Sequence, residues 1–536
     1  MKFDPLYYPH ASQRVATYAK RGMVATSQPL AAEAGLNVLR KGGNAIDAAI
    51  ATAACLTVVE PTSNGIGSDA FAIVWHKGQL YGLNASGGAP QTISLEALRR
   101  QGHTEMPKFG FAPVTVPGAV AGWAALSERF GRLPLTEVFA EAIELAEGGF
   151  PLSPTLGHSW KRALTADRKQ FTGCEFDPYF ALFAPNGRPP EIGEMWRSPH
   201  HAATLAAIAA TRGEAFYRGD LAERMVAFAK KHGGFLERGD LESYRVEWVE
   251  PLAANYRGYD VWQLPPNGQG LVTLLALKIL GEFDFNNAPS TATYHKQIEA
   301  IKLAFSVGFA HITDPAYMKL SPQDLLHDDF VAECRARISE NAHEPAPLTP
   351  LGGGTVYLAT ADGEGNMVSL IQSNYMGFGS RIVIPETGIA LQNRGNSFSL
   401  DPAHINALAP GKRPYHTIIP GFLTQQGQAI GPFGVMGGFM QPQGHVQVLM
   451  NSIDFNLNPQ AALDAPRWQW ISGTTVHVEP SFPNHLALAL LRQGHQVVRT
   501  LDSGSFGRGQ IIWRNPATGV LCGGTESRAD GHIACF

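Results

Sequence analysis

The sequence predicts an α+β fold, because strand-like and helix-like segments dominate different parts of one core-building chain. Of the 536 residues, 44% are hydrophobic and 16% are charged, a balance typical of folded rather than disordered proteins. Strand patterns are concentrated near the beginning of the chain and again beyond residue 354, and helical patterns fill most of the interval between them. The length suggests three or four domains, although one large layered body also fits it.

The first elements alternate between strand and helix. Residues 21–29 (RGMVATSQP) have the pattern of a short apolar strand, and Pro29–Leu39 that of a helix with proline in its first turn. The next predicted helix, residues 45–60, consists almost entirely of small side chains. Because small side chains let backbones approach closely, we expect it to lie deep between layers. Strands are predicted at Phe71–Trp75 and Gln79–Asn84, joined by a tight turn.

Helices are predicted to dominate residues 119–148 and 198–233, and residues 294–312 are predicted to form a further amphipathic helix. The character changes at residues 343–354 (HEPAPLTPLGGG), where three prolines and three consecutive glycines indicate a linker. Beyond it, residues 355–373 (TVYLATADGEGNMVSLIQS) read as two alternating strands around a turn. More strands follow, and then a helix at about residues 445–453.

Charge and cysteine usage exclude several classes of function. The 42 basic and 46 acidic residues give a net charge of −4, which offers no basic surface for nucleic acid or anionic membrane. The five cysteines are scattered without a CxxC pair, so neither a disulfide framework nor a zinc knuckle is favoured. The sequence shows no secretory h-region and no uncharged apolar run approaching about 18 residues. We therefore expect a cytoplasmic protein.

Three other patterns indicate ordinary structure rather than chemistry. Gly65–Ala70 fits a loose GxGxxA fingerprint, but no strand leads into it, so a tight turn is favoured. His200-His201 and His327-Asp328-Asp329 have no partners at metal-ligand spacing, which favours surface or capping roles. A GxSxG elbow is missing from the sequence. No metal site is predicted.

The junction between Gly354 and Thr355 is a stronger candidate for a catalytic site than these three patterns. A run of three glycines precedes Thr355, a hydroxyl residue at the first position of a predicted strand. If the backbone were cut before Thr355, this residue would own both a nucleophilic hydroxyl and an α-amine of pKa about 7.7–8.0 that can act as base. Gly437-Gly438, after an apolar strand, could present two N–H groups to one oxyanion. The alternative for the Gly354-Thr355 junction is a plain linker, and the alternative for Gly437-Gly438 is a turn that needs positive φ.

Several sequence blocks, in the same order, resemble the γ-glutamyltransferase (γ-glutamyltranspeptidase) family of N-terminal-nucleophile hydrolases over almost the entire chain. These blocks are residues 22–71, Tyr256–Gly270, residues 355–369, Gly377–Ser380, Lys412–Pro414 and residues 437–454. The resemblance implies a four-layer αββα sandwich, made as one inactive chain that cuts itself between Gly354 and Thr355. Residues 1–354 and 355–536 would then stay together as large and small subunits of one compact unit, and a dimer of such heterodimers is a compatible assembly.

The resemblance also assigns roles to four residues. Thr355 takes the position of the nucleophile, and Ser373 that of a second hydroxyl residue that supports it. Gly437 and Gly438 fall on the glycines of the oxyanion hole. These assignments imply an acyl-enzyme mechanism that needs neither a metal nor an organic cofactor.

Positions that would contact a γ-glutamyl group differ from the family pattern. Ser86 replaces the arginine that holds the α-carboxylate, and Ser397 replaces the aspartate that holds the α-amine. The other changed positions are Tyr375, Arg394, His416 and Thr417. Losing a charge-assisted contact costs about 2–3 kcal/mol, so losing two would weaken binding of a zwitterion by about a few thousandfold.

These departures predict an amidohydrolase with a substrate other than a free γ-glutamyl amino acid. The branch that includes oxamate amidohydrolase and cytoplasmic γ-glutamyltransferase-like proteins is the nearest in pattern. Arg394 would bind a carboxylate beside the scissile amide, which suits oxamate, or would only pair with a protein carboxylate. A glutathione hydrolase or γ-glutamyl transferase, a cephalosporin-type acylase and an unprocessed binding protein are the alternatives.

Overall fold

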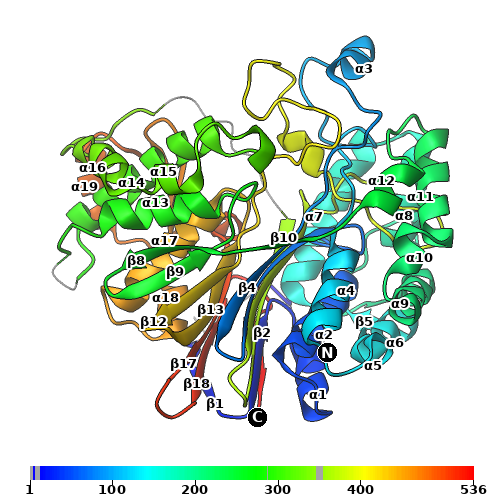
Figure 1. Ribbon diagram of the computed structural model, residues 1–536, viewed down its shortest axis with the longest axis horizontal. Helices are drawn as coiled ribbons and strands as arrows, with labels where there is room; N and C mark the ends of the chain where they lie inside the picture. The colour runs from blue at the N-terminus through cyan, green and yellow to red at the C-terminus, as the bar shows by residue number, and fades with distance from the viewer. Residues whose placement is uncertain (1–3, 7–12, 286–287, 346–353) are drawn as a thin grey trace.

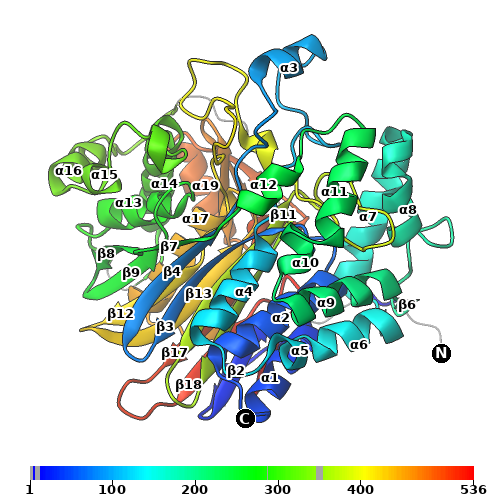
Figure 2. The ribbon, with the colours of Figure 1, turned by 45° about the vertical axis from the view of Figure 1, so that its right-hand side comes forward.

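The computed structural model describes residues 4–6, 13–285, 288–345 and 354–536 (Figure 1). Two seven-stranded sheets lie face to face at its centre, and helices cover the outer face of each (Figures 1 and 2). The predicted αββα sandwich is confirmed. Eight of the nine residues from 346 to 354, which contain most of the expected linker, lie outside the described residues.

The first sheet has the order β19-β2-β10-β11-β3-β4-β7. Its strands are β2 (Gly22–Thr26), β3 (Asp69–His76), β4 (Gln79–Ala85), β7 (Glu247–Val249), β10 (Gly354–Asp362), β11 (Met367–Tyr375) and β19 (His532–Cys535). β10 pairs in antiparallel fashion with β2 on one side and with β11 on the other. The strand that begins at the proposed cleavage site is therefore an interior strand of this sheet.

The second sheet has the order β1-β18-β17-β13-β12-β9-β8. Its strands are β1 (Thr17–Ala19), β8 (Leu252–Tyr256), β9 (Tyr259–Gln263), β12 (Gly421–Gln425), β13 (Gln428–Met436), β17 (Arg508–Arg514) and β18 (Leu521–Thr525). Two small sheets complete the strands of the described residues: β5 (Phe150–Pro151) with β6 (Met195–Trp196), and β14 (Trp468–Ser472), β15 (Thr475–Val478) and β16 (Gln496–Arg499).

The α-helices between residues 29 and 243 are α1 (Pro29–Arg40), α2 (Ala45–Val59), α3 (Leu95–Arg100), α4 (Ala119–Phe130), α5 (Leu135–Val138), α6 (Ala140–Gly148), α7 (Pro154–Gln170), α8 (Asp177–Phe183), α9 (Pro199–Thr211), α10 (Glu214–Tyr217), α11 (Asp220–Lys231) and α12 (Arg238–Ser243). Of these helices, α1, α2 and α4 pack on the first sheet, and most of the others pack on these three or on one another. Helices do dominate residues 119–148 and 198–233, where turns that contain Gly131 and Gly213 separate α4 from α5 and α9 from α10; Gly213 adopts a positive φ.

The remaining helices cover the second sheet or the small sheet beside it. They are α13 (Gly270–Leu280), α14 (Thr291–His311), α15 (Pro322–Leu325), α16 (Asp328–Ala336), α17 (Met440–Ile453), α18 (Pro459–Asp464) and α19 (Asn484–Arg492). α17 begins five residues earlier than the sequence predicted. Pro442 lies in its first turn, where the missing N–H is not needed, so this proline does not end the helix.

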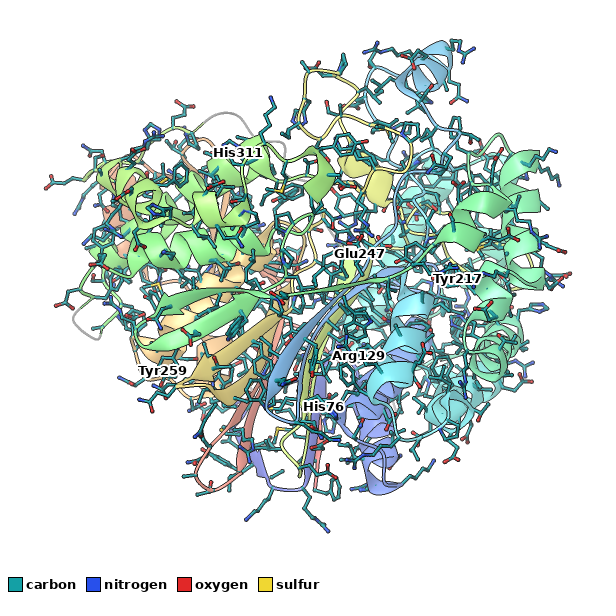
Figure 3. All side chains as sticks on the ribbon, viewed as in Figure 1. His76, Arg129, Tyr217, Glu247, Tyr259 and His311 are labelled. Carbon is teal, nitrogen blue, oxygen red and sulfur yellow. The ribbon has the colours of Figure 1, made fainter. Side chains whose placement is uncertain are left out.

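The helix of small residues lies where the sequence placed it. Every residue of α2 is buried, and it packs on β10 and β11 as well as on α1. Asn44 caps its first turn by accepting from the N–H groups of Ile46 and Asp47. Asn44 also donates to the carbonyl of Phe130 at the end of α4, where Arg129 stacks on Tyr81 and Phe130 packs near His76 (Figure 3).

The alternation along β10 decides which way the side chain of Thr355, the expected nucleophile, faces. Val356 and Leu358 pack against the helices of the first layer, whereas Tyr357 and Ala359 belong to the core between the sheets. Because side chains alternate along a strand, Thr355 points in the same direction as Tyr357, toward the second sheet.

Candidate active site

Thr355 lies opposite Ser373 in the register of β10 and β11. Their hydroxyl oxygens are 2.9 Å apart, and both residues are buried. Ser373 donates its single proton to the carbonyl oxygen of Gly354 at 2.7 Å, and its oxygen accepts from the N–H of Tyr375 at 2.8 Å. The Thr355 hydroxyl is therefore the donor in its contact with Ser373. One serine thus connects the hydroxyl of Thr355 to the carbonyl oxygen of Gly354, on the two sides of the expected cleavage site.

Arg394 brings a buried positive charge to this pair of hydroxyls. Its Nη2 donates to Ser373 Oγ at 3.3 Å and its Nη1 to Thr417 Oγ1 at 2.7 Å. Its Cζ lies 4.2 Å from the centre of the Tyr375 ring, a cation–π contact. Burial lowers the pKa of Arg394 to about 10, so the guanidinium stays protonated at neutral pH.

The guanidinium has unused donors. Within the described part of the chain, Arg394 forms no ion pair with a carboxylate, and its buried Nε–H donates to no partner. Asp69 is the acidic group whose charge acts on it. A buried cation without a directly bound counter-ion is costly, and an anionic ligand would relieve that cost.

Asp69 and His416 form a fully buried pair next to Arg394. The His416 Nδ1 accepts from the N–H of Ile418 at 3.3 Å, so Nε2 carries the proton and donates to Asp69 Oδ2 at 3.1 Å. Burial raises the pKa of Asp69 to about 7, although the charge of Arg394 opposes this shift. Burial, together with the charge of Arg394, holds the pKa of His416 well below its usual range, so this ring is neutral.

Gly437 and Gly438 lie between β13, which packs across β10 and β11, and the start of α17. Their φ angles are 141° and 60°, so this is a turn that favours glycine, as one of the two interpretations held. Their carbonyls accept from the N–H groups of Met440 and Gln441. No turn or loop hydrogen bond among the described residues uses the two glycine N–H groups, which leaves them available for an oxyanion.

A cavity of 560 Å³ opens beside Arg394 and the Gly437-Gly438 turn. Tyr375, which stacks on Arg394, and Phe439, which follows the two glycines, are both part of its lining. Aromatic and aliphatic side chains make up much of the rest of the wall: Met106, Phe309, Ile312, Phe398, Leu400 and Tyr415. The buried side-chain oxygens of Tyr375, Asn396 and Ser397 have no partner of good hydrogen-bond geometry. The lining also includes the charged residues Glu105, Lys108 and Asp401, and the Tyr375 hydroxyl interacts with Ser397, so the cavity combines an aromatic wall with polar groups.

Ser86 lies outside this cavity. Its hydroxyl donates to Asn84 at 2.7 Å and receives a contact from Asn267 at 3.4 Å. The carbonyl of Asn267 in turn accepts from the N–H of His416. Ser86 thus belongs to a buried amide network behind His416, whereas Tyr375, Arg394 and Thr417 come together with Thr355.

Sequence reasoning missed Asp69 and Gln269, which both contact this site. Asp69 was part of a motif interpreted as a tight turn, and no local pattern distinguishes it from the first residue of an ordinary strand. Gln269 lies in the block Tyr256–Gly270, which carried the resemblance but no assigned role. Long-range contacts of this kind leave no periodic signal in the sequence.

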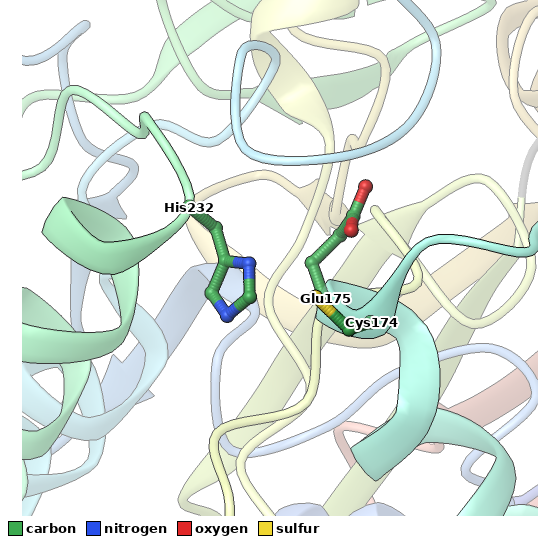
Figure 4. A group of neighbouring side chains, drawn as sticks. All are labelled: Cys174, Glu175 and His232. Atoms are coloured by element: carbon green, nitrogen blue, oxygen red, sulfur yellow. The ribbon is translucent and has the colours of Figure 1, made fainter.

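Potential metal ligands gather elsewhere. The ligand atoms of Cys174, Glu175 and His232 all lie within 4.8 Å of one another (Figure 4). Cys174 is exposed. Of the predicted surface or capping histidines, His327 does cap α16 by accepting from Asp329.

A second group consists of His295, Glu299 and His495, all buried. The ammonium of Lys302 donates to Glu299 at 2.7 Å, so a protein cation already occupies the acidic ligand of this group. His201 of the predicted histidine pair is buried and bonds Thr57, whereas His200 is exposed. Among the described residues, no helix is long and apolar enough to cross a membrane.

A nucleophile position on a central strand of an αββα sandwich, with a second hydroxyl beside it, defines an N-terminal-nucleophile hydrolase acting on amide bonds. The family model described as Gamma-glutamyltranspeptidase matches residues 31–536, and the chain belongs to this family.

Proteins that are similar to this chain are named for different activities. The glutathione hydrolase-like YwrD proenzyme of Bacillus subtilis is 36% identical over 95% of this chain and 97% of its own length. The oxamate amidohydrolase proenzyme of Klebsiella pneumoniae is 35% identical over 98% of this chain and 100% of its own. The crystal structure of cephalosporin acylase from Bacillus halodurans is 60% identical, with a TM-score of 0.98, covering 100% of this chain and 99% of that one.

Proposed function

We propose that this chain is a self-processing amidohydrolase that uses Thr355 as its N-terminal nucleophile and hydrolyses amides whose acyl part carries a carboxylate. The observation that carries the proposal is the shared Ser373 hydroxyl. It contacts the Thr355 hydroxyl on one side and the guanidinium of Arg394, which has no directly bound counter-ion among the described residues, on the other. A carboxylate on Arg394 would place a neighbouring amide close to Thr355.

Self-cleavage would come first. Thr355 Oγ adds to the carbonyl carbon of Gly354, whose oxygen already accepts from Ser373, and the hydroxyl proton passes to the Thr355 nitrogen as the Gly354–Thr355 C–N bond breaks. The resulting ester is hydrolysed by water, which leaves a carboxylate on Gly354 and a free α-amine on Thr355. The nearby charge of Arg394 favours the neutral form of this amine.

Turnover would use the same hydroxyl with the new amine as its base. The amine takes the proton of Thr355 Oγ as the oxygen adds to the substrate carbonyl, and the N–H groups of Gly437 and Gly438 stabilise the oxyanion. The amine then returns this proton to the leaving nitrogen, and an ester to Thr355 remains. Water hydrolyses the ester and releases the acid.

Oxamate is the small substrate that this arrangement suits, because its carboxylate adjoins its amide. The cavity supports a second candidate, a cephalosporin-type acylase. Its 560 Å³ and its aromatic wall leave room for a group far larger than oxamate. The similarity to a structure named as a cephalosporin acylase agrees with this candidate. The neutral Tyr375 and Ser397 hydroxyls, in contrast, give no counter-charge for the ammonium of a γ-glutamyl group.

A turnover assay on purified protein tests the proposal. Oxamate, a glutaryl-cephalosporin and glutathione are compared for wild type and Thr355→Ala. We expect hydrolysis of at least one of the first two substrates, faster than that of glutathione, and none by Thr355→Ala. Efficient hydrolysis of glutathione alone would instead identify a glutathione hydrolase, and loss of self-cleavage in wild type would favour a binding protein.

A further inference from the structure

The side chain of Gln269 connects two loops of the candidate site. It lies in the connection between β9 and α13 and is fully buried. Its Nε2 donates to the carbonyl oxygen of Thr417 at 2.7 Å and to that of Gly438 at 2.9 Å. Both protons of the amide are therefore used, one for the loop that binds Arg394 and one for the oxyanion turn.

Two more contacts fix Gln269 to the Arg394-binding loop. Its Oε1 accepts from the Tyr415 hydroxyl at 3.1 Å, and its backbone N–H donates to the carbonyl of His416 at 2.9 Å. Three consecutive residues, 415 to 417, are thus held by one glutamine. Tyr415 lines the cavity, and Thr417 binds the guanidinium of Arg394.

The Gly437-Gly438 turn needs such support from outside. Glycines have no side chain to pack, and both residues adopt positive φ, so little within the turn itself restricts its orientation. An oxyanion donor is effective only when it lies about 2.7–3.1 Å from the developing charge. The anchor for the carboxylate and the oxyanion donors lie on separate loops, so their relative position must be set by a third group.

We propose that Gln269 is a positioning residue that sets the spacing between the carboxylate anchor, Arg394 with Thr417, and the Gly437-Gly438 oxyanion turn. This inference rests on the proposed amidohydrolase function. Among the described residues, Gln269 forms no hydrogen bond with Thr355 or Ser373, so it acts on turnover through the two loops. Self-cleavage draws on the contacts of Ser373 with Gly354 and Thr355, and it does not depend on this spacing.

The test compares two substitutions that remove the same kind of contacts. Gln269→Met keeps the length of the side chain but removes both donated bonds and the accepted one. Gln447→Met is the matched control, because the buried Gln447 also donates to two carbonyls, of Gln443 and Trp468, and accepts from one N–H. Gln447 contacts none of the residues assigned to the reaction.

We expect complete self-cleavage and a similar loss of melting temperature in both variants. Gln269→Met should lose tenfold or more in kcat on the best carboxylate-bearing substrate, with kcat of Gln447→Met within twofold of wild type. Gln269→Glu, which keeps an acceptor for Tyr415 but loses both donors, should show the same kcat defect. This variant also shows whether the donated bonds, rather than the packing, are responsible.

Equal kcat in Gln269→Met and Gln447→Met would overturn the inference. It would also be overturned if both Gln269 variants failed to self-cleave while Gln447→Met succeeded, because Gln269 would then serve folding. A wild type that self-cleaves but shows no Thr355-dependent turnover of any of the three substrates would refute the proposed function, and this inference with it. These outcomes are distinguishable in one set of preparations.

Discussion

At the scale of single residues, Arg394 is the group whose surroundings say most about the substrate. Two of its nitrogens donate to the hydroxyls of Thr417 and Ser373, its Nε–H is unused, and the Tyr375 ring covers one face. This arrangement fixes the plane of the guanidinium. A fixed plane suits the forked recognition of a carboxylate, which an ammonium cannot reproduce.

Arg394→Lys should therefore lower kcat/KM for a small 2-oxo acid amide by tenfold or more, about 1.4 kcal/mol. The charge is kept, but the fork and the stacking on Tyr375 are lost. Steady-state kinetics on oxamate measure the effect, and intact mass should show normal self-cleavage. A Lys variant as active as wild type would mean that Arg394 serves only the packing of the small subunit.

The raised pKa of Asp69 predicts a pH dependence of activity that can be distinguished from the one caused by the α-amine of Thr355. The pKa of Asp69 is raised to about 7, so the carboxyl is neutral below that pH and leaves Arg394 free to bind an anion. Above it, the ionised carboxylate repels a substrate carboxylate. On the acid side, activity requires the neutral α-amine of Thr355, whose ordinary pKa of about 7.7–8.0 is lowered by Arg394.

We expect a bell-shaped profile of kcat/KM against pH in wild type, with a descending limb near pH 7. In Asp69→Asn the descending limb should disappear and the ascending limb should remain. An uncharged amide substrate without a carboxylate provides the control, because its kcat/KM should show no descending limb in either protein. Persistence of the limb in Asp69→Asn would assign it to another group.

At the scale of elements, α2 shows how closely two layers can approach when side chains are small. Gly35 of α1 faces this helix, and a Cβ placed on it would lie 2.3 Å from Thr52 Oγ1. Thr52 is buried, and a β-branched side chain in a helix has little freedom to move aside. The contact therefore requires a glycine at position 35.

Gly35→Ala should destabilise the protein by about 1–3 kcal/mol through overpacking. Gly148→Ala, at the end of α6, is the control, because a Cβ there meets nothing within 4 Å. It should be neutral or stabilising by at most about 1 kcal/mol. Urea unfolding of both variants measures the difference, and equal midpoints would contradict this account of the α1–α2 contact.

The elements also show what the sequence could and could not predict. The burial of α2 followed from its composition, and the hairpin of β10 and β11 followed from its alternation and turn. The hairpin places residues near its open end opposite each other, which is why Thr355 meets Ser373. The start of α17 was missed because Pro442 reads as a helix breaker unless it lies in the first turn.

The contacts of Asp69 and Gln269 could not be predicted in this way. Asp69 bonds a histidine 347 positions away, and Gln269 bonds carbonyls 148 and 169 positions away. Such contacts depend on how the two sheets are placed, and neither periodicity nor turn chemistry specifies that placement. Resemblance supplied the roles of Thr355 and the glycines, whereas the geometry around Arg394 had to come from the structure.

At the scale of the whole molecule, the two proposed subunits share both sheets. In the first sheet β10, β11 and β19 come from residues 355–536, apart from the first residue of β10, and the other four strands come from residues 1–354. In the second sheet β1, β8 and β9 come from the large fragment and the other four strands from the small one. Neither fragment holds a complete core, so the two should stay together after cleavage.

Self-cleavage at the Gly354–Thr355 bond is the prediction that tests this view of the molecule. Purified wild type should give two masses by denaturing mass spectrometry, for residues 1–354 and 355–536, and one particle containing both fragments by native mass spectrometry. Thr355→Ala should remain a single inactive chain, whereas Thr355→Ser keeps a hydroxyl and should still cleave. Strands of the two fragments are hydrogen-bonded neighbours at β19–β2, β2–β10 and β11–β3 in the first sheet and at β1–β18 and β12–β9 in the second, so separating the fragments requires breaking hydrogen bonds within both sheets. A wild type that hydrolyses amides as one intact chain would refute the N-terminal mechanism, and fragments that separate under native conditions would contradict the shared core.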